Sequence, residues 1–467
     1  MQTAILLLLS TNNYYRICSA GLRPAELSAF KYRGLMTNRA VFKNASWIVG
    51  CKIIQSLLGL IVGMQTARYL GPDNYGLVSY AAAVAAFFVP VMQLGLRSTL
   101  VQEFIQNPEE EGEILGSALV MNIVSSLICI VGIVSFVSIA NRGESDTIIV
   151  CALYSVNLVF QALEMIQYWF QAKLLSKYYA IISVIAYTAV SVYKIILLIT
   201  RKSIYWFAIS QVLDYAIIAV SLIIIYIHNK DNQKLSFSWK RGKTMLSVSK
   251  YYIISSLMVT IFSHTDSIML KLMVDKAATG YYTAAVSCAT LTSFVFGAVI
   301  DSMRPAILAS KLVSQQEFES KMKQLVSVVV WMALAQSVII TVFAKLLVVF
   351  LYGDAYTPAA DALRIVTWYS AFSYLGSVRN IWILAEDKHR FLWIVNLVGA
   401  LGNVILNTLL IPVMGVGGAA LASVITQLAT NVGMGFIIPT FRPYNKLMIK
   451  GTNPRYALNL LSGFRRN

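Results

Sequence analysis

The sequence predicts an all-α, polytopic membrane protein with about twelve membrane-spanning helices in two six-helix lobes. Its 467 residues are 58% hydrophobic and 13% charged, whereas a soluble chain is nearer half apolar and a quarter charged. The mean hydropathy is +0.68, and apolar runs of about 20 residues, enough to cross a bilayer, recur along the chain. This composition excludes an ordinary soluble enzyme, a disordered protein and a nucleic-acid-binding domain.

The apolar runs and their breakers place the helices in order. The first lobe is predicted to contain helices over 45–68, 75–97, 114–140, 147–171, 179–200 and 204–227. Gly71 and Pro72 end the first of them, because neither residue favours a helix interior. The second lobe is predicted to contain helices over 248–272, 281–303, 324–351, 361–385, 391–412 and 417–440.

The polar segments between the apolar runs define five regions. These are an amino-terminal extension over 1–40, a first lobe over 41–227, a cytoplasmic linker over 228–247, a second lobe over 248–441 and a basic cytoplasmic tail over 442–467. We expect Met36 to be the translational start, so that 1–35 is an unstructured extension. The apolar run 4–9 is too short to span, and its basic residues follow it, so it makes a poor signal peptide.

The distribution of positive charge predicts the orientation. The chain carries a formal net charge of +17. Of its 38 Lys and Arg, 27 fall in the tails and even-numbered connections and seven in the odd-numbered connections. Because cytoplasmic loops are enriched in Lys and Arg, both termini are predicted to be cytoplasmic.

The two halves resemble each other, which indicates a duplicated unit. Residues 71–76, between helices one and two, match 275–281, between helices seven and eight. Residues 168–178 match 381–391 at the four/five and ten/eleven turns. Since each half has an even number of helices, the repeat is parallel, and a binding site is expected between the halves.

Apart from the cations counted with the tails and connections, four remain inside predicted spans, and each is costly unless it faces a polar interior. They are Lys52, Lys194, Arg364 and Arg379. Fixed cations in a wet cavity suit an anionic substrate such as a phosphate or pyrophosphate. The alternative for Lys194, Arg364 and Arg379 is snorkelling from a span end, or an intramembrane ion pair.

Acids and one histidine also fall inside spans: Glu164, Asp214, His264 and Asp266. We interpret them as coupling or gating groups, because a carboxylate at membrane depth can take a proton or a sodium ion. The alternative is that they pair with lysines. No catalytic constellation, metal-ligand spacing or cysteine framework is evident, so neither a catalytic site, a metal nor a bound cofactor is predicted.

At this point the pattern resembles a known family. Residues 67–76 read Ala-Arg-Tyr-Leu-Gly-Pro-Asp-Asn-Tyr-Gly, and 265–270 read Thr-Asp-Ser-Ile-Met-Leu. With Gly280-Tyr281-Tyr282 and the small-residue opening of the last helix at 415–420, they resemble the Wzx-type polysaccharide flippases of bacteria. These belong to the multidrug/oligosaccharidyl-lipid/polysaccharide (MOP) exporter superfamily. The resemblance covers about 36–445.

The resemblance implies a V-shaped, MATE-like fold that works by alternating access in the bacterial cytoplasmic membrane. It implies an undecaprenyl-pyrophosphate-linked oligosaccharide as substrate, an ion gradient as a source of coupling, and other polysaccharide assembly proteins as partners beside the lipid bilayer. Nucleic acid is not among the expected partners. A MATE-type multidrug/cation antiporter and, less favoured, a membrane-embedded glycan polymerase or transferase are the alternatives. The glycan, the pathway, the coupling ion and the oligomeric state do not follow from the residues.

Overall fold

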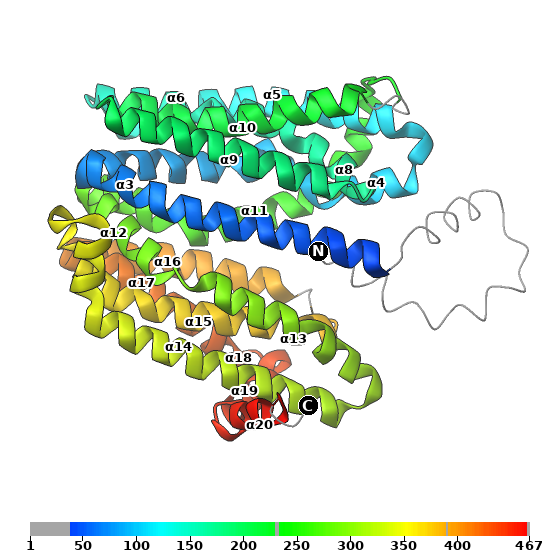
Figure 1. Ribbon diagram of the computed structural model, residues 1–467, viewed down its shortest axis with the longest axis vertical. Helices are drawn as coiled ribbons and strands as arrows, with labels where there is room; N and C mark the ends of the chain where they lie inside the picture. Colours follow the sequence, from blue (N-terminus) through cyan, green and yellow to red (C-terminus); the bar gives the residue numbers. More distant parts are fainter. Residues whose placement is uncertain (1–37, 229–232, 389–390, 465–467) are drawn as a thin grey trace, which may run out of the picture.

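Figure 1 shows the computed structural model, which describes residues 38–228, 233–388 and 391–464. Every regular element in these residues is a helix, and ten of the helices are long and apolar enough to cross a membrane. The chain is therefore a multi-pass membrane protein, because a helix satisfies its own backbone hydrogen bonds inside lipid. Most of the predicted extension, residues 1–37 of 1–40, lies outside the described part of the chain.

The first lobe runs from the first described residue to His228. Its helices are α3 (Asn38–Met92), α4 (Leu100–Gln106), α5 (Glu111–Ala140), α6 (Ser145–Ser155), α7 (Asn157–Leu163), α8 (Gln167–Ala172), α9 (Ser176–Ile199) and α10 (Ile204–His228). The short turns η2 (Leu96–Ser98), η3 (Pro108–Glu110) and η4 (Glu164–Ile166) join them. Together α6, η4 and α7–α8 form the predicted fourth helix.

The second lobe follows the linker. Its helices are α11 (Trp239–Met273), α12 (Lys276–Ala289), α13 (Ser293–Val313), α14 (Gln315–Tyr352), α15 (Ala359–Ala385), α16 (Leu392–Met414), α17 (Val416–Leu428) and α18 (Met434–Ile437). The short elements are η5 (Asp354–Tyr356), the π-helical turn η7 (Ala429–Gly433) and η8 (Pro439–Phe441). Two helices, α19 (Arg442–Gly451) and α20 (Arg455–Phe464), occupy the predicted tail.

A kink at Gly71 divides α3 into two arms. Gly71 has φ 71° and ψ 172°, a backbone conformation that a residue with a Cβ rarely adopts. The arms, 38–70 and 72–92, correspond to the predicted first and second helices. With the interrupted pairs α12–α13 and α17–α18 each counted as one, the described residues match the twelve predicted helices.

The linker is shorter than predicted because it is held on the first lobe. Ser238 caps α11 by accepting a hydrogen bond from the Arg241 backbone N–H, so that α11 begins at Trp239 rather than near 248. The Ser236 N–H donates to the Gly112 carbonyl at 3.2 Å, and the Ser238 N–H donates to Ser117 Oγ at 3.0 Å. The linker therefore lies against the start of α5.

Equivalent positions of the two lobes make equivalent contacts, which supports the parallel repeat. Trp169 in α8 and Trp382 in α15 occupy matching positions of the predicted repeat, and both are buried. Four residues beyond each tryptophan, a charged side chain forms an ion pair. Lys173 pairs with Glu111 at the start of α5, and Glu386 pairs with Lys311 near the end of α13. The signs are reversed between the lobes: the cation follows the tryptophan in the first and the anion follows it in the second.

The two lobes meet where α3 and α12 cross. A Cβ on Gly76 would lie 1.8 Å from the Lys276 carbonyl oxygen, and a Cβ on Gly280 would lie 2.2 Å from the Pro72 carbonyl oxygen. Gly76 and Gly280 occupy matching positions in the repeat, so the contact is reciprocal. We call this end of the bundle, which includes the turns at 71–76 and 274–280, the closed end. In Figure 1 the lobes spread apart from the closed end, at the left, toward the right.

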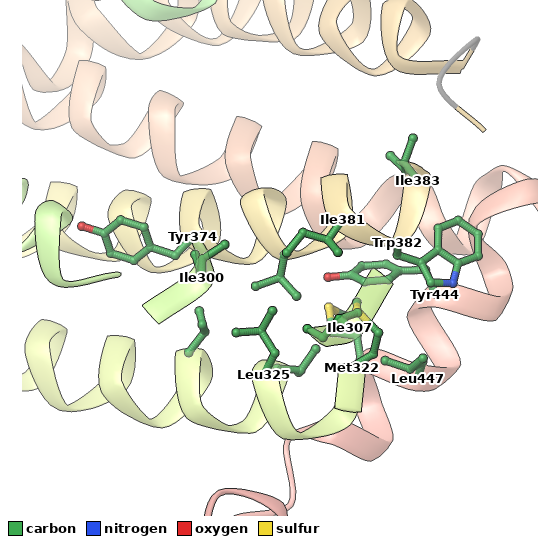
Figure 2. Packing of buried hydrophobic residues seen from close by; sticks show 14 of the residues in the cluster. Ile300, Ile307, Met322, Leu325, Tyr374, Ile381, Trp382, Ile383, Tyr444 and Leu447 are labelled. Carbon is green, nitrogen blue, oxygen red and sulfur yellow. The ribbon is translucent and has the colours of Figure 1, made fainter. Parts of the chain in front are cut away.

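The core of the second lobe is completed by the carboxy-terminal segment. Figure 2 shows Leu325 and Met322 of α14 packed with Ile381 and Trp382 of α15, and with Tyr444 of α19. The Tyr444 ring lies 5.8 Å from the Trp382 ring, and its hydroxyl donates to the Leu375 carbonyl at 3.2 Å. The predicted tail is therefore, in part, a structural element of the lobe.

We predict that Gly280→Ala destabilises the contact between the lobes. The new methyl group would overlap the Pro72 carbonyl, so α3 and α12 must move apart, and overpacking of this kind costs about 1–3 kcal/mol. A lower thermal midpoint in detergent is expected. Gly402→Ala is the control, since a Cβ there meets nothing within 4 Å; equal midpoints for the two variants would contradict the prediction.

Candidate functional site

Among the candidate site residues, Asp266 of α11 accepts the largest number of side-chain hydrogen bonds in the described structure. It is 4% exposed. Its Oδ1 accepts hydrogen bonds from the side-chain amides of Asn403, at 3.0 Å, and Asn407, at 2.6 Å. Its Oδ2 accepts from the hydroxyls of Tyr282 and Ser423. All four donors are uncharged, so the carboxylate is held by dipoles rather than by a cation.

Four helices build this carboxylate site, which we call the Asp266 site. Asn403 and Asn407 are one turn apart on α16 and therefore share a face, with Asn407 Nδ2 donating to Asn403 Oδ1 at 3.1 Å. Tyr282 comes from α12 and Ser423 from α17. The Asn407 Oδ1 atom is buried without a hydrogen-bond partner, so the site retains one unused acceptor beside the carboxylate.

His264 is separate from the Asp266 site. It precedes Asp266 by two residues on α11, and residues with this spacing point to different sides of a helix. His264 is half-buried, whereas Asp266 is buried. His264 donates none of the four hydrogen bonds to Asp266, but it is near enough to interact with that carboxylate electrostatically.

The first lobe contains a second cluster of ionisable groups. The Glu164 carboxylate, in η4, is buried and accepts a hydrogen bond from Tyr179 Oη of α9 at 2.8 Å. Asp214 of α10 and Arg97 are near enough to interact with it electrostatically. Asp214 also interacts with Lys194 of α9, and its Oδ1 is buried without a hydrogen-bond partner. The structure thus brings together three of the predicted residues, Glu164, Lys194 and Asp214.

The predicted arginines do not lie together. Arg379 is buried in the second lobe, where its Nη1 donates to the Thr430 carbonyl of η7, and its Nε has no hydrogen-bond partner. Arg364 is half-exposed and pairs with Asp361 at 2.7 Å. At 1.5 Å per residue, about 22 Å of α15 separates them. They cannot hold one phosphate, because they lie at opposite ends of the helix. Lys52 belongs to α3, and its side chain lies outside the described part of the structure.

An ion pair that the sequence does not indicate joins the lobes at the closed end. Lys271 of α11 is 6% exposed, and its Nζ lies 2.7 Å from Glu144 Oε2 between α5 and α6. Nζ also donates to the Asn141 side chain and lies 5.6 Å from the centre of the Tyr80 ring. Lys271 is one of the seven cations counted with the odd-numbered connections, and only the fold brings the turn between α5 and α6 beside it. We call these four residues the Lys271 latch.

Further bonds between the lobes occur at the same end. The Tyr356 hydroxyl donates to the Ala67 carbonyl at 2.9 Å, and Arg68 donates to the Phe350 carbonyl. The Tyr75 ring lies 6.2 Å from the Tyr356 ring. At the other end α11 itself provides contact, since Ser249 Oγ donates to the Leu94 carbonyl at 2.7 Å. Helix α11 therefore packs on both lobes.

The sequence did not predict the hydrogen-bond donors to Asp266 or the ion pair of the Lys271 latch. Asn403 and Asn407 did carry a signal, namely two amides one turn apart in an apolar span, which is costly unless both are bonded internally. Tyr282 and Ser423 carried none, because single hydroxyls in membrane helices are common. Among residues 38–228, 233–388 and 391–464, no group of three or more His, Cys, Asp or Glu could hold a metal ion.

Comparisons with known proteins agree on family and fold. A family model described as "Polysaccharide biosynthesis protein" matches residues 41–311, more than half of the chain. A curated protein of Escherichia coli (strain K12), named "Putative O-antigen transporter", is 19% identical over 401 residues, covering 84% of this chain and 94% of its own.

Two solved structures share the architecture. The lipid II flippase MurJ, in an inward closed conformation, superposes with a TM-score of 0.71 at 16% identity, covering 87% of this chain and 89% of its own. An inward-facing MATE-family multidrug resistance transporter of the MOP superfamily gives 0.65 at 14% identity, covering 85% and 96%. The predicted MATE-like fold is confirmed.

We predict that the Lys271 latch contributes stability that depends on pH. Burial opposes ionisation of Glu144, but hydrogen bonds from Lys271 and Thr147 outweigh it and lower the pKa of Glu144 below 4.5. A lowered pKa stabilises the fold above the unfolded value of about 4.3, and that stability is lost as pH falls through the folded value. The thermal midpoint of the wild type should exceed that of Glu144→Gln at pH 7, and the difference should shrink as the pH falls below the unfolded value.

The control for this measurement is Asp361→Asn, which removes a carboxylate that is paired on the surface of α15. Its midpoint should follow the wild type at every pH, because an exposed pair within one helix contributes little. A Glu144→Gln deficit that does not shrink as the pH is lowered through the acid range would show that the carboxylate charge is not what stabilises the latch.

Proposed function

This chain belongs to the polysaccharide biosynthesis protein family, and from that premise we propose that it is a flippase for a lipid-linked oligosaccharide. The observation that carries the proposal is the combination of this family with a two-lobed fold shared with a lipid II flippase. The name of the Escherichia coli relative supports it. The proposed activity is transport and not catalysis: the substrate changes leaflet and no covalent bond changes.

The proposed substrate is an oligosaccharide on undecaprenyl pyrophosphate, moved across the bacterial cytoplasmic membrane for surface polysaccharide assembly. A pyrophosphate needs fixed cations, and the spans provide Lys52, Lys194, Arg364 and Arg379. Arg379 keeps an unused N–H donor in the interior of the second lobe, which favours it over Arg364, already paired with Asp361. Lys52 is proposed from its depth in α3. Other polysaccharide assembly proteins are proposed partners.

The proposed mechanism is alternating access, with both termini on the cytoplasmic side. In that orientation the closed end faces the exterior, and the Lys271 latch and the Gly76–Gly280 crossing hold it shut. Opening the exterior requires Lys271 to leave Glu144 and Asn141, and the Tyr356–Ala67 bond to break. Helix α11 packs on both lobes, so a movement between them must bend or turn it.

We propose that the Asp266 site takes the coupling cation, a proton or a sodium ion. A carboxylate beside amide and hydroxyl oxygens is a hard oxygen donor set, and the unused Oδ1 of Asn407 adds one acceptor. Binding a cation would neutralise a charge that is otherwise held by dipoles alone. Glu164 and Asp214 in the first lobe, and His264 on α11 in the second lobe, are proposed as further coupling or gating groups.

The alternative function is a MATE-type multidrug/cation antiporter. The structural similarity to a MATE-family transporter favours it, as do buried carboxylates in both lobes. An antiporter would take a cationic substrate, for which Arg379 would be unfavourable. The two functions differ in what a complemented cell gains, a surface glycan or drug resistance.

We predict that the chain restores surface glycan in a bacterial strain that lacks its own flippase. Lys52→Ala and Arg379→Ala should each lower the glycan on a gel about tenfold or more, because a charge-assisted hydrogen bond contributes about 1.5–3 kcal/mol. Lys345→Ala, which removes an exposed lysine of α14, is the control. Normal glycan levels would remove a residue from the proposal, and drug resistance without glycan would favour the antiporter.

We predict that a cation stabilises the purified protein through Asp266. A ligand that binds the folded state alone adds about 2.7 kcal/mol at one hundred times its Kd. The wild type should therefore melt higher in sodium than in potassium chloride, or show a corresponding pH dependence if the ion is a proton. Asp266→Asn should abolish the dependence. An unchanged dependence in Asp266→Asn, or none in the wild type, would exclude Asp266 as the coupling group.

A further inference from the structure

The carboxy-terminal helices α19 and α20 form an element that the transport cycle described above does not use. Each has ten residues, too few to cross a bilayer. They follow α18 and lie beside α14 on the outside of the second lobe (Figure 1). Their sequence separates apolar and basic residues onto different faces, as in helices that lie in the plane of a membrane surface.

The inner face of α19 fixes the helix to the lobe. Tyr444, Leu447 and Met448 are buried against α14 and α15, and Figure 2 shows Tyr444 and Leu447 facing this core. A Cβ on Gly451 would lie 2.8 Å from the Val326 side chain, so α19 ends in close contact with α14. The position of the helix is set by packing.

Two hydrogen bonds fix the position of the turn between α19 and α20 along α14. Ser327 Oγ donates to the Asn453 carbonyl at 2.9 Å, and Trp331 Nε1 donates to the Thr452 carbonyl at 3.0 Å. The charged residues at the start of α14 end with Lys323, and an apolar run begins at Leu325. Trp331 is exposed, and tryptophan is enriched at membrane–water interfaces. The turn therefore lies beside the first turns of the apolar run of α14, just past its charged start.

The outer face of this element carries a row of unpaired cations. Arg442, Lys446 and Lys450 are spaced by one turn each on α19, and Arg455 opens α20; all four are exposed. None of the four forms an ion pair with a described acidic residue. Beside the row, Ile449 is 53% exposed and Leu458 is 60% exposed. This face of α19 and α20 therefore combines exposed positive charges with exposed apolar side chains.

We propose that α19 and α20 form a binding surface for anionic phospholipid headgroups of the leaflet in which they lie. The four cations take the lipid phosphates, and Ile449 and Leu458 contact the upper acyl chains. Charge complementarity and the level on α14 together identify this occupant: a soluble anion would need no apolar neighbours, and a zwitterionic lipid would not need four unpaired cations. The surface anchors the outer flank of the second lobe while the other lobe moves.

The test compares lipid binding by the purified full chain and two variants. The first variant is Arg442→Gln/Lys446→Gln/Lys450→Gln/Arg455→Gln. The matched control removes four exposed lysines on the linker and α11, Lys234→Gln/Lys240→Gln/Lys243→Gln/Lys250→Gln. Each protein is titrated in zwitterionic nanodiscs that contain increasing fractions of fluorescent phosphatidylglycerol, and energy transfer to the lipid is measured from a dye attached at residue 453.

We expect the first variant to bind phosphatidylglycerol at least fivefold more weakly than the wild type, and the control variant to lose less than twofold. Equal losses in both variants, or no loss in the first, would overturn the proposal. Release of the lipid by equimolar inorganic phosphate would also overturn it, since the surface would then be a simple anion site. If the first variant fails to fold, Lys446→Gln/Lys450→Gln is measured in its place. The assay requires no transport, so its result is independent of the proposed function.

Discussion

The close backbone approach at Gly76 and Gly280 is the constraint on which the arrangement of the lobes depends. Because neither glycine has a Cβ, the openings of two helices can cross at a distance that any other residue would prevent. The lobes therefore meet at one end, where the Lys271 latch and the Tyr356–Ala67 bond also lie. Away from that end the main link between the lobes is α11, so the crossing and α11 together fix how the two lobes are placed.

The second constraint is that lipid offers no hydrogen bonds, so polar groups inside the bundle must be satisfied by the protein. Asp266 meets this requirement with four neutral donors from three other helices. Arg379 and Asp214 meet it incompletely, since each keeps a buried atom without a partner. The four bonds to Asp266 tie four helices together, although the Asn407 Oδ1 beside them also lacks a partner.

Much of the fold was predictable, and the exceptions have physical causes. Hydropathy located the helices because each must bury its own backbone in lipid, and matched motifs at Gly76 and Gly280 indicated the repeat. Hydropathy could not show that α11 begins at Trp239, because its first turns are polar and the segment before it is held in place by Ser117. Nor could it show that the basic tail folds, because Tyr444 is buried only when α15 is beside it. Both depend on contacts between distant segments.

The candidate site divides in the same way. By itself, the sequence determined which ionisable residues are at membrane depth, because a span has a fixed length and each charge in it must have a partner. Only the tertiary structure decided the partners: it placed Asn403, Asn407, Tyr282 and Ser423 around Asp266, brought the Thr430 carbonyl to Arg379, and brought Glu144 to Lys271. Depth is a property of one segment, whereas a partner is a property of how several segments pack.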